Sequence, residues 1–300
     1  MTTDSVRQRK TLDGAFAFLG LICLLIGVVT LLVLLVDLFI DGAPRFSYDF
    51  FANFPSRFPN KAGILSSWIG TIIVMAVTAV AAVPIGVAAG VYLEEYAPKN
   101  WFTNLIEINI ANLAGVPSIV YGLMALGLFV YKFGFGQSIL TAGLTLALLI
   151  LPIVIIATRE SIRAIPASIR EAAYALGATK WQTVQHHVLP YSTGGILTGV
   201  IIGLSRAIGE SAPLITVGAL TFIAFLPPSP FQGSFPFISF DWLLSPYTVL
   251  PIQLFNWVSR PQPAFHLNAA AAGLVVMFMT LAMNGAAIAI RHRYRRKIKW

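Results

Sequence analysis

The chain has 300 residues, of which 57% are hydrophobic and only 11% are charged, and its mean hydropathy is +0.79. A chain of this composition would not stay soluble, and apolar runs of about 20 residues are long enough to cross the ~30 Å hydrocarbon layer as helices. The net charge of +8 does not indicate nucleic-acid binding, because the basic residues sit at the ends of the apolar runs, where they set orientation. Cys23 is the lone cysteine, so no intramolecular disulfide is possible.

The apolar runs predict an all-α membrane protein with six spans. The predicted spans are 14–40, 64–93, 105–131, 137–158, 193–226 and 266–290. The first run is too long for the core of a cleaved signal peptide, so we expect it to be retained as a helix. If both termini are cytoplasmic, the inner segments carry 14 of the 20 Lys and Arg residues and the outer segments carry 5, a bias that favours this orientation.

The longest polar interval between two apolar spans covers residues 159–190 and is predicted to fold as two short cytoplasmic helices. Ser168 and Glu171 have the S-x-x-E spacing of a capping box, in which each side chain satisfies a free amide of the first turn. Gly177 supplies a left-handed stop. Apolar residues at i, i+3, i+4 and i+7 form one face of the first helix: Ile169, Ala172, Ala173 and Leu176.

The second short helix is predicted to begin at another capping box, formed by Thr179 and Gln182. It carries Trp181 and is expected to end at Pro190, which cannot continue a helix. A small amphipathic helix held in water between membrane spans needs a surface that covers its apolar face. We expect this surface to be on another protein.

Two long segments are expected on the outer side. Residues 41–63 are rich in Phe and Pro, and residues 227–265 contain eight prolines, a density that blocks regular helix. One short helix is expected near 247–258. The second segment is either a floppy connector or an ordered outer cap, and its aromatic residues favour the cap: Phe231, Phe235, Phe237, Phe240, Trp242 and Trp257.

Small residues and prolines inside the spans predict close packing and one break. Gly86 and Gly90 form a G-x-x-x-G pair in span two. In span three, Pro117 follows Asn112 and Gly115 and should bend or break the helix. A stripe of small residues, which serves packing within the chain or close approach of another helix, opens span five: Gly195, Gly199, Gly203 and Ala207.

Span five also contains two charged residues, Arg206 and Glu210, whose i, i+4 spacing puts them on one helix face that overlaps the glycine stripe. A charge at the centre of a membrane helix costs roughly 2.5–3.5 kcal/mol, so the pair is expected to point into the protein or a water-filled path. Either the two charges only neutralise each other, or they line the path of a charged solute. The planar fork of Arg suits an oxyanion. A carboxylate beside it suits an anion that carries a proton, as hydrogen phosphate does and sulfate does not.

Arg159, at the cytoplasmic end of span four, either contributes to an inner gate for an anion or marks where the helix meets water. The chain has no G-x-x-x-x-G-K-[ST] sequence, so it has no P-loop and is not expected to hold ATP. It has no Cys/His cluster with metal-binding spacing, and the adjacent His186 and His187 would point apart on a helix.

The EAA loop of binding-protein-dependent ABC importer permeases is similar to the stretch EAAYALGATKWQTVQHHVLP at 171–190. In that family this loop is the coupling helix, which docks in a groove of the ATPase subunit. The resemblance continues in NLAGVPSIVYGL of span three and SRAIGESAPLITVGA of span five, which point to phosphate importers, and it covers most of 63–220. The residues expected to couple to the ATPase are Glu171, Ala172, Ala173, Leu176, Gly177 and Pro190.

The resemblance implies a type I importer permease fold in the inner (plasma) membrane, with no covalent chemistry and no cofactor in this chain. The implied partners are a second, PstC-like permease, two copies of a PstB-like ATPase that binds ATP and Mg²⁺, a PstS-like phosphate-binding protein, inorganic phosphate and membrane lipid. The resemblance places Arg206 and Glu210 in the phosphate path and Arg159 at a basic position similarly implicated. The expected parts are a cytoplasmic N-terminus (1–13), a first transmembrane helix with its outer segment (14–62), a permease domain (63–290) that includes the coupling loop 159–190 and the outer cap 227–265, and a basic cytoplasmic tail (291–300).

Other functions remain open at this point. A permease for sulfate or molybdate would keep the same architecture. An ion-coupled secondary transporter working alone would be favoured by an inverted repeat, and none is obvious in the sequence. A membrane-embedded enzyme that uses Glu210 as acid or base would need a second carboxylate or a metal cluster beside it. A helix-turn-helix DNA reader at 168–190 is disfavoured by its position between two membrane spans.

Overall fold

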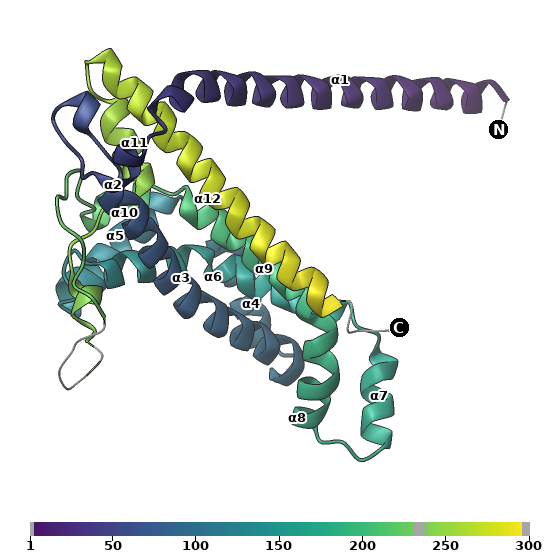
Figure 1. Ribbon diagram of the computed structural model, residues 1–300. Helices are drawn as coiled ribbons and strands as arrows, with labels where there is room; N and C mark the ends of the chain where they lie inside the picture. Colours follow the sequence, from purple (N-terminus) through teal and green to yellow (C-terminus); the bar gives the residue numbers. More distant parts are fainter. Residues whose placement is uncertain (1–2, 231–236, 238, 296–300) are drawn as a thin grey trace.

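The computed structural model describes residues 3–230, 237 and 239–295, and these residues form helices and connecting segments with no β-strand. Figure 1 shows a bundle of long helices from which α1 extends to one side and a short helical pair projects at one end. The α-helices are α1 (Thr3–Gly42), α2 (Tyr48–Ala52), α3 (Leu65–Val91), α4 (Trp101–Leu113), α5 (Ser118–Ala125), α6 (Ile139–Arg163), α7 (Ala167–Ala175), α8 (Lys180–Thr183), α9 (Leu189–Ile208), α10 (Ala212–Val217), α11 (Leu250–Val258) and α12 (Pro263–Arg295). Turns of π-helix continue α3, α5 and α8: η3 (Tyr92–Tyr96), η4 (Leu126–Lys132) and η5 (Val184–Val188).

The predicted number of membrane spans is confirmed. In the part of the chain that the structure describes, five helices are long and apolar enough to cross a membrane, and the bent pair of α4 and α5 makes a sixth crossing if it counts as one span. The long helices cover Leu12–Arg45, Leu65–Tyr96, Ile139–Arg163, Lys180–Ile208 and Pro263–Arg293. The basic tail begins inside α12, and its last residues, 296–300, lie outside the described part of the chain, as do residues 1–2.

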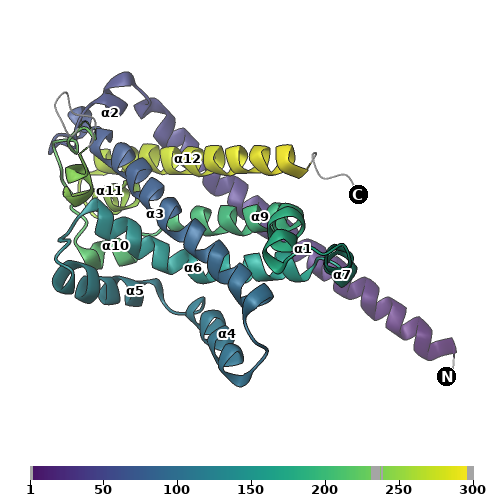
Figure 2. The ribbon, with the colours of Figure 1, turned by 90° about the horizontal axis from the view of Figure 1, so that it is seen from below.

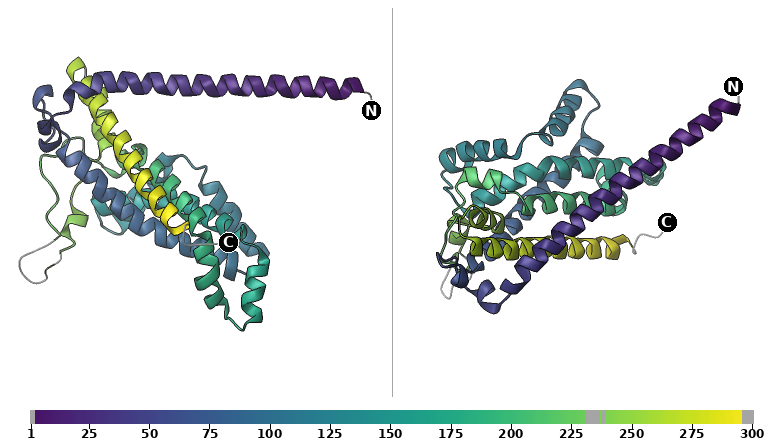
Figure 3. Two further views of the ribbon diagram at one scale, coloured as in Figure 1. Left: turned by 45° about the vertical axis from the view of Figure 1, so that its right-hand side comes forward. Right: turned by 90° about the horizontal axis from the view of Figure 1, so that it is seen from above.

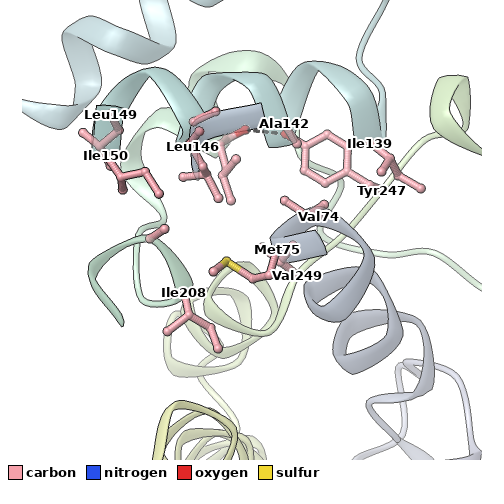
Figure 4. Close-up of a cluster of buried hydrophobic side chains, with 14 of the residues drawn as sticks. Val74, Met75, Ile139, Ala142, Leu146, Leu149, Ile150, Ile208, Tyr247 and Val249 are labelled. Atoms are coloured by element: carbon pink, nitrogen blue, oxygen red, sulfur yellow. Dashed lines mark hydrogen bonds between the residues drawn. The ribbon is translucent and has the colours of Figure 1, made fainter. Parts of the chain in front are cut away.

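The centre of the bundle is α6, which packs against both α3 and α9, and Figure 4 shows side chains of the three helices meeting in the core. Glycines allow these close approaches, as their pattern predicted: a Cβ at Gly90 of α3 would lie 2.6 Å from the Cβ of Thr158. The glycine stripe of α9 faces α6, with Gly195 against Ser161 and Gly203 against Ile150. The stripe therefore serves packing within this chain. Side chains from α3, α6, the end of α9 and the outer segment meet in the main apolar core: Val74, Met75, Ile139, Ala142, Leu146, Leu149, Ile150, Ile208, Tyr247 and Val249.

Most of helix α1 lies outside the bundle. Both views in Figure 3 show it extending away from the other helices, and none of its most apolar window is buried within this chain. It contacts α12 near its own C-terminal end, where a Cβ at Gly42 would lie 2.9 Å from the backbone nitrogen of Ala271. An apolar helix of this length needs lipid or another chain around it.

The predicted break in span three is confirmed. The chain leaves α4 at Leu113 and enters α5 at Ser118, and the two helices are bent by 107° (Figure 2). Pro117 causes the break, because it lacks an amide proton and disfavours helical geometry in the residue before it. The joint is held by Tyr121, whose hydroxyl donates to the carbonyl oxygen of Leu113 at 2.7 Å.

The prediction of one helix over 193–226 is wrong in two ways. The helical ladder ends at Ile208, a short α10 follows, and residues 218–226 are not helical, although they are apolar. Gly218 has φ +97°, which ends α10, and Pro213 lacks the amide that would continue α9 into α10. At the other end, Pro190 does not stop the second short helix. The wider π-helical turn η5 comes directly before Pro190, and the helix continues into α9.

The described residues of the outer cap include the predicted helix. The helix expected near 247–258 is present as α11, and its Trp257 is fully buried against Phe50 and Phe265. Phe237 and Phe240 are exposed, whereas Phe231 and Phe235 lie outside the described residues. The cap therefore closes over the outer ends of α3 and α12 through a separate aromatic cluster.

Candidate functional site

Two interrupted helices lie side by side in the middle of the chain. The break between α4 and α5 ends four residues before Gly122, and the break between α9 and α10 ends just before Pro213. These two residues touch: a Cβ at Gly122 would lie 2.7 Å from both the Cα and the carbonyl oxygen of Pro213. Breaks at membrane depth are tolerated only where protein or a watery cavity surrounds the freed backbone groups. The paired breaks are therefore the place in this bundle where a polar path fits best.

Arg206 and Glu210 lie at one of these breaks. Arg206 is in the last turn of α9, Glu210 is just past its end, and the Arg206 Nε lies 3.4 Å from the Glu210 Oε1. The expected pairing is confirmed. The two charged residues share the angular range of the glycine stripe, as expected at 100° per residue. Ala207 continues the stripe into the core, whereas Arg206, in the last turn of α9, remains exposed together with Ile202.

The pair is partly open in this chain. The side chains of Arg206 and Glu210 are 39% and 19% exposed. Within the described residues, Arg206 forms no other ion pair. The void beside Glu210 measures ≈ 10 Å³, which is room for about one water molecule. An oxyanion does not fit in this void.

Arg159 does not join the pair. Helices α6 and α9 are antiparallel, and Gly203, close to Arg206, packs against Ile150. Arg159 is nine residues further along α6, or about 13 Å at 1.5 Å per residue. It is buried, and its Nη2 lies 2.6 Å from the Glu107 Oε1 and 3.5 Å from the Glu94 Oε2. Its role in a solute path stays a prediction.

The acidic partners of the arginines at the C-terminal end of α6 and in α7 were missed in the sequence. Glu94 and Glu95 lie in η3, at the end of α3, and Glu107 lies in α4. They pair with Arg159, Arg163 and Arg170. The signal was available, because these carboxylates and arginines fall near span ends that the charge bias assigns to one side of the membrane.

The polar interval folds as the predicted pair of short helices, α7 and α8, and projects from the bundle (Figure 1). The Thr179–Gln182 capping box is confirmed. The Ser168–Glu171 box is wrong: Pro166 occupies the N-cap, the helix starts at Ala167, and no side chain caps it. Proline is favoured near a helix start because its φ is already fixed, and its ψ of 138° sets the boundary earlier than the polar pattern suggested.

The end of α7 has the predicted left-handed stop. Gly177 has φ +82°, and the amides of Gly177 and Ala178 donate to the carbonyl oxygens of Tyr174 and Ala173. These two bonds make a Schellman motif. Gly177 has open space around it, so its backbone angle is the reason for glycine here.

The apolar face of α7 divides into an inner and an outer part. Ala173 is buried and Ile169 is half-buried, whereas Leu176 is 89% exposed and Trp181 of α8 is 59% exposed. Glu171 and Ala172 are also exposed, as is Pro190. A leucine and a tryptophan at the tip of a projecting helical pair are an apolar surface that this chain leaves uncovered.

Comparisons with known proteins identify the class of molecule. Residues 82–298 match the family described as binding-protein-dependent transport system inner membrane component. The chain belongs to this family. It is therefore a multi-pass component of the inner membrane, and within a transport system it is a membrane component and not an enzymatic one.

Relatives in sequence span nearly the whole chain. The phosphate transport system permease protein PstA of Mycobacterium leprae is 32% identical over 285 residues, which are 93% of this chain and 88% of that protein. The protein of the same name from Xylella fastidiosa (strain Temecula1 / ATCC 700964) is 29% identical and covers 96% of both chains.

Solved structures support the fold. A chain from a bacterial ABC transporter that imports the acidic polysaccharide alginate aligns with a TM-score of 0.63 over 95% of this chain and 96% of its own length, at 14% identity. The MetNI methionine ABC transporter, in an inward-facing conformation, aligns with a TM-score of 0.57 over 75% of this chain and 94% of its own, at 18% identity. This inner membrane component has the type I importer permease fold that the resemblance implied.

Proposed function

We propose that this inner membrane component is the permease subunit of an ATP-driven phosphate importer and forms half of its translocation pathway. The single observation that carries the proposal is the charged pair Arg206–Glu210, which lies open at the paired helix breaks. Charges at membrane depth cannot face lipid without a large cost, so an open pair must face a second chain or water. The relatives that cover most of the chain and are named phosphate transport permeases support phosphate as the solute.

The site is proposed to be completed by a second, PstC-like permease. The pair lies on the open side of α9, and the void beside Glu210 is too small for an anion. Arg206 would hold phosphate oxygens through its planar fork. Glu210 accepts a hydrogen bond from an anion that carries a proton, which distinguishes hydrogen phosphate from sulfate. Sites of this kind must bind weakly enough for the ion to leave.

The projecting pair α7–α8 is proposed to dock on a PstB-like ATPase, which binds ATP and Mg²⁺ and supplies the energy. The uncovered tip, with Leu176 and Trp181, is the surface that docking would cover. The proposed orientation has both termini in the cytoplasm, which puts α7 and α8 there, and a PstS-like binding protein would deliver phosphate to the outer cap. The excess of Lys and Arg at the inner ends of the spans supports this orientation.

The proposal is tested by purifying the tagged chain in mild detergent and identifying the proteins that come with it by mass spectrometry. We expect an ATPase, a second permease and a phosphate-binding protein, and ATP-driven uptake of phosphate when the complex is placed in proteoliposomes. Uptake of sulfate or molybdate in place of phosphate would change the substrate. A chain that purifies alone and still transports would contradict the importer proposal.

A substitution at the turn between α7 and α8 tests the docking role. In Gly177→Val, a β-branched residue is forced to φ +82°, a left-handed conformation that costs roughly 1–2 kcal/mol. We expect ATP-driven phosphate uptake to fall roughly 5- to 30-fold while the chain still inserts. The matched control is Gly194→Val in α9, which also has open space around it but has ordinary helical geometry. Full uptake by the Gly177 variant would count against docking through this turn.

A further inference from the structure

We call helices α7 and α8 together the coupling segment. At its base, Arg170 of α7 contacts both η3 and the end of α6. Its Nε and Nη2 lie 2.9 and 2.7 Å from the Glu95 Oε1. Its Nη1 donates to the carbonyl oxygen of Ile165 and its Nη2 to that of Ile162, both at 3.0 Å. Ile162 lies in the last turn of α6 and Ile165 lies just past the end of that helix, where backbone carbonyls lack the regular helical partners. One side chain on α7 therefore holds η3 and the end of α6 together.

The Arg170–Glu95 pair is mostly shielded from water. The side chains are 19% and 6% exposed, and the Arg fork makes four contacts. A pair of this kind is costly to break, because the remaining charge stays buried without a partner. The pair therefore restrains how α7 moves relative to α3 in a way that an exposed salt bridge does not.

Glu94, the neighbour of Glu95, points toward other helices. Its Oε2 lies 3.0 Å from the Arg163 Nη2 and 3.5 Å from the Arg159 Nη2, both on α6. Arg159 in turn lies 2.6 Å from Glu107 on α4. The π-helical turn η3 thus carries two adjacent carboxylates, of which one faces the coupling segment and the other faces α6 and, through Arg159, α4.

Apart from α6, the only span that adjoins the coupling segment directly along the chain is α9. The helix from Lys180 to Ile208 is continuous, so displacement of α8 moves α9 directly. Helix α3 has no such connection to the coupling segment. A contact must carry the displacement to α3, and among the ion pairs of the described residues the one that joins α7 to η3 is Arg170–Glu95.

We propose that the Arg170–Glu95 pair is the joint through which the coupling segment moves the cytoplasmic end of α3, and through Glu94 and Arg159 the end of α4. Arg170 and Glu95 are positioning residues and touch no substrate. The inference rests on the proposed function, because it assigns a route to motion that the ATPase would start. Breaking the joint leaves α9 coupled and removes the ion pair to η3, whereas the contact of the Lys180 ammonium with the Tyr96 ring remains between the coupling segment and η3. ATP hydrolysis then continues while less phosphate is moved for each ATP.

The test uses the complete complex in proteoliposomes with the binding protein, and it measures phosphate uptake and ATP hydrolysis on the same vesicles. In Glu95→Gln and in Arg170→Gln, we expect the phosphate moved per ATP to fall roughly tenfold, as expected for residues that carry coupling between sites. The charge exchange, Glu95→Arg with Arg170→Glu, is expected to recover part of the loss. The control is Glu160→Gln, whose carboxylate pairs only with Arg163 among the described ion pairs and is exposed.

Each outcome decides something different. A wild-type complex without ATP-driven uptake would defeat the proposed function itself. A second outcome is that the wild type transports and both single variants keep its ratio of phosphate moved to ATP hydrolysed, with any lower uptake matched by a smaller amount of assembled complex. In that case the pair only anchors the helices and the inference fails. If the glutamine variants do not assemble, Arg170→Lys decides, because lysine keeps the charge and loses the fork that reaches both Glu95 and the α6 carbonyls. A lowered ratio supports the joint, and an unchanged ratio overturns it.

Discussion

Replacing Arg206 by glutamine is expected to reduce phosphate uptake by roughly 10- to 150-fold. This range corresponds to the roughly 1.5–3 kcal/mol that a hydrogen bond to a charged group contributes. The loss follows because the glutamine amide cannot supply the positive charge or the planar fork that matches two phosphate oxygens. The measurement is ATP-driven uptake of labelled phosphate in proteoliposomes, divided by the amount of complex. Arg206→Lys keeps the charge and should retain an intermediate rate.

A double variant that also changes Glu210 distinguishes the two interpretations of the charged pair. If Arg206 and Glu210 only neutralise each other, the double variant Arg206→Gln/Glu210→Gln removes both charges together and should transport normally. If they line the path, the double variant should transport no better than Arg206→Gln alone. Normal phosphate uptake by the double variant would show that the pair is structural, and it would remove the observation on which the phosphate path rests.

Local patterns predicted the features that local chemistry controls. The break at Pro117, the stop at Gly177 and the Thr179–Gln182 capping box were predicted, and the structure contains all three. Each depends on a residue whose own backbone preference or nearby side chain decides the outcome. The same reasoning failed at Ser168, because Pro166 two residues earlier set the helix start and the polar spacing did not.

The features that depend on distant neighbours were not predictable in the same way. Hydropathy alone extended span five to residue 226, because the chain after Gly218 is apolar although its conformation is irregular and, of residues 219–226, only Ile223 is buried. The orientation of Arg206 followed from where α9 ends and which of its faces α6 covers. The partners of Arg159 lie on α3 and α4, and no periodicity within α6 contains that information.

The long exposed helix α1 needs apolar surroundings that the helix bundle does not supply. Leu12–Arg45 is the most apolar span, and none of its apolar window is buried here. The partly exposed pair Arg206–Glu210 needs polar surroundings instead. Lipid can satisfy the first but not the second. The charges therefore require a second chain or water beside α9, and hydrophobicity alone would not have indicated this.

The contact between the two broken helices should tolerate no side chain at Gly122. In Gly122→Val, the new Cβ would lie 2.7 Å from the Cα and carbonyl oxygen of Pro213, and it would also collide with the Thr216 hydroxyl. The Thr216 side chain can rotate away, but the backbone of Pro213 cannot, so α5 and α10 must separate. We expect a destabilisation of at least about 3 kcal/mol, the upper end for overpacked cores.

The Gly122 variant should therefore show little folded chain in the membrane and a clearly lowered Tm in detergent, as measured by size-exclusion chromatography after stepwise heating. Gly127→Val is the matched control, because Gly127 lies in the π-helical turn that continues the same helix and has open space around it. Equal stability of the two variants would mean that α5 and α10 are not in contact in the membrane. The paired breaks, and with them the polar path placed between them, would then have to be abandoned.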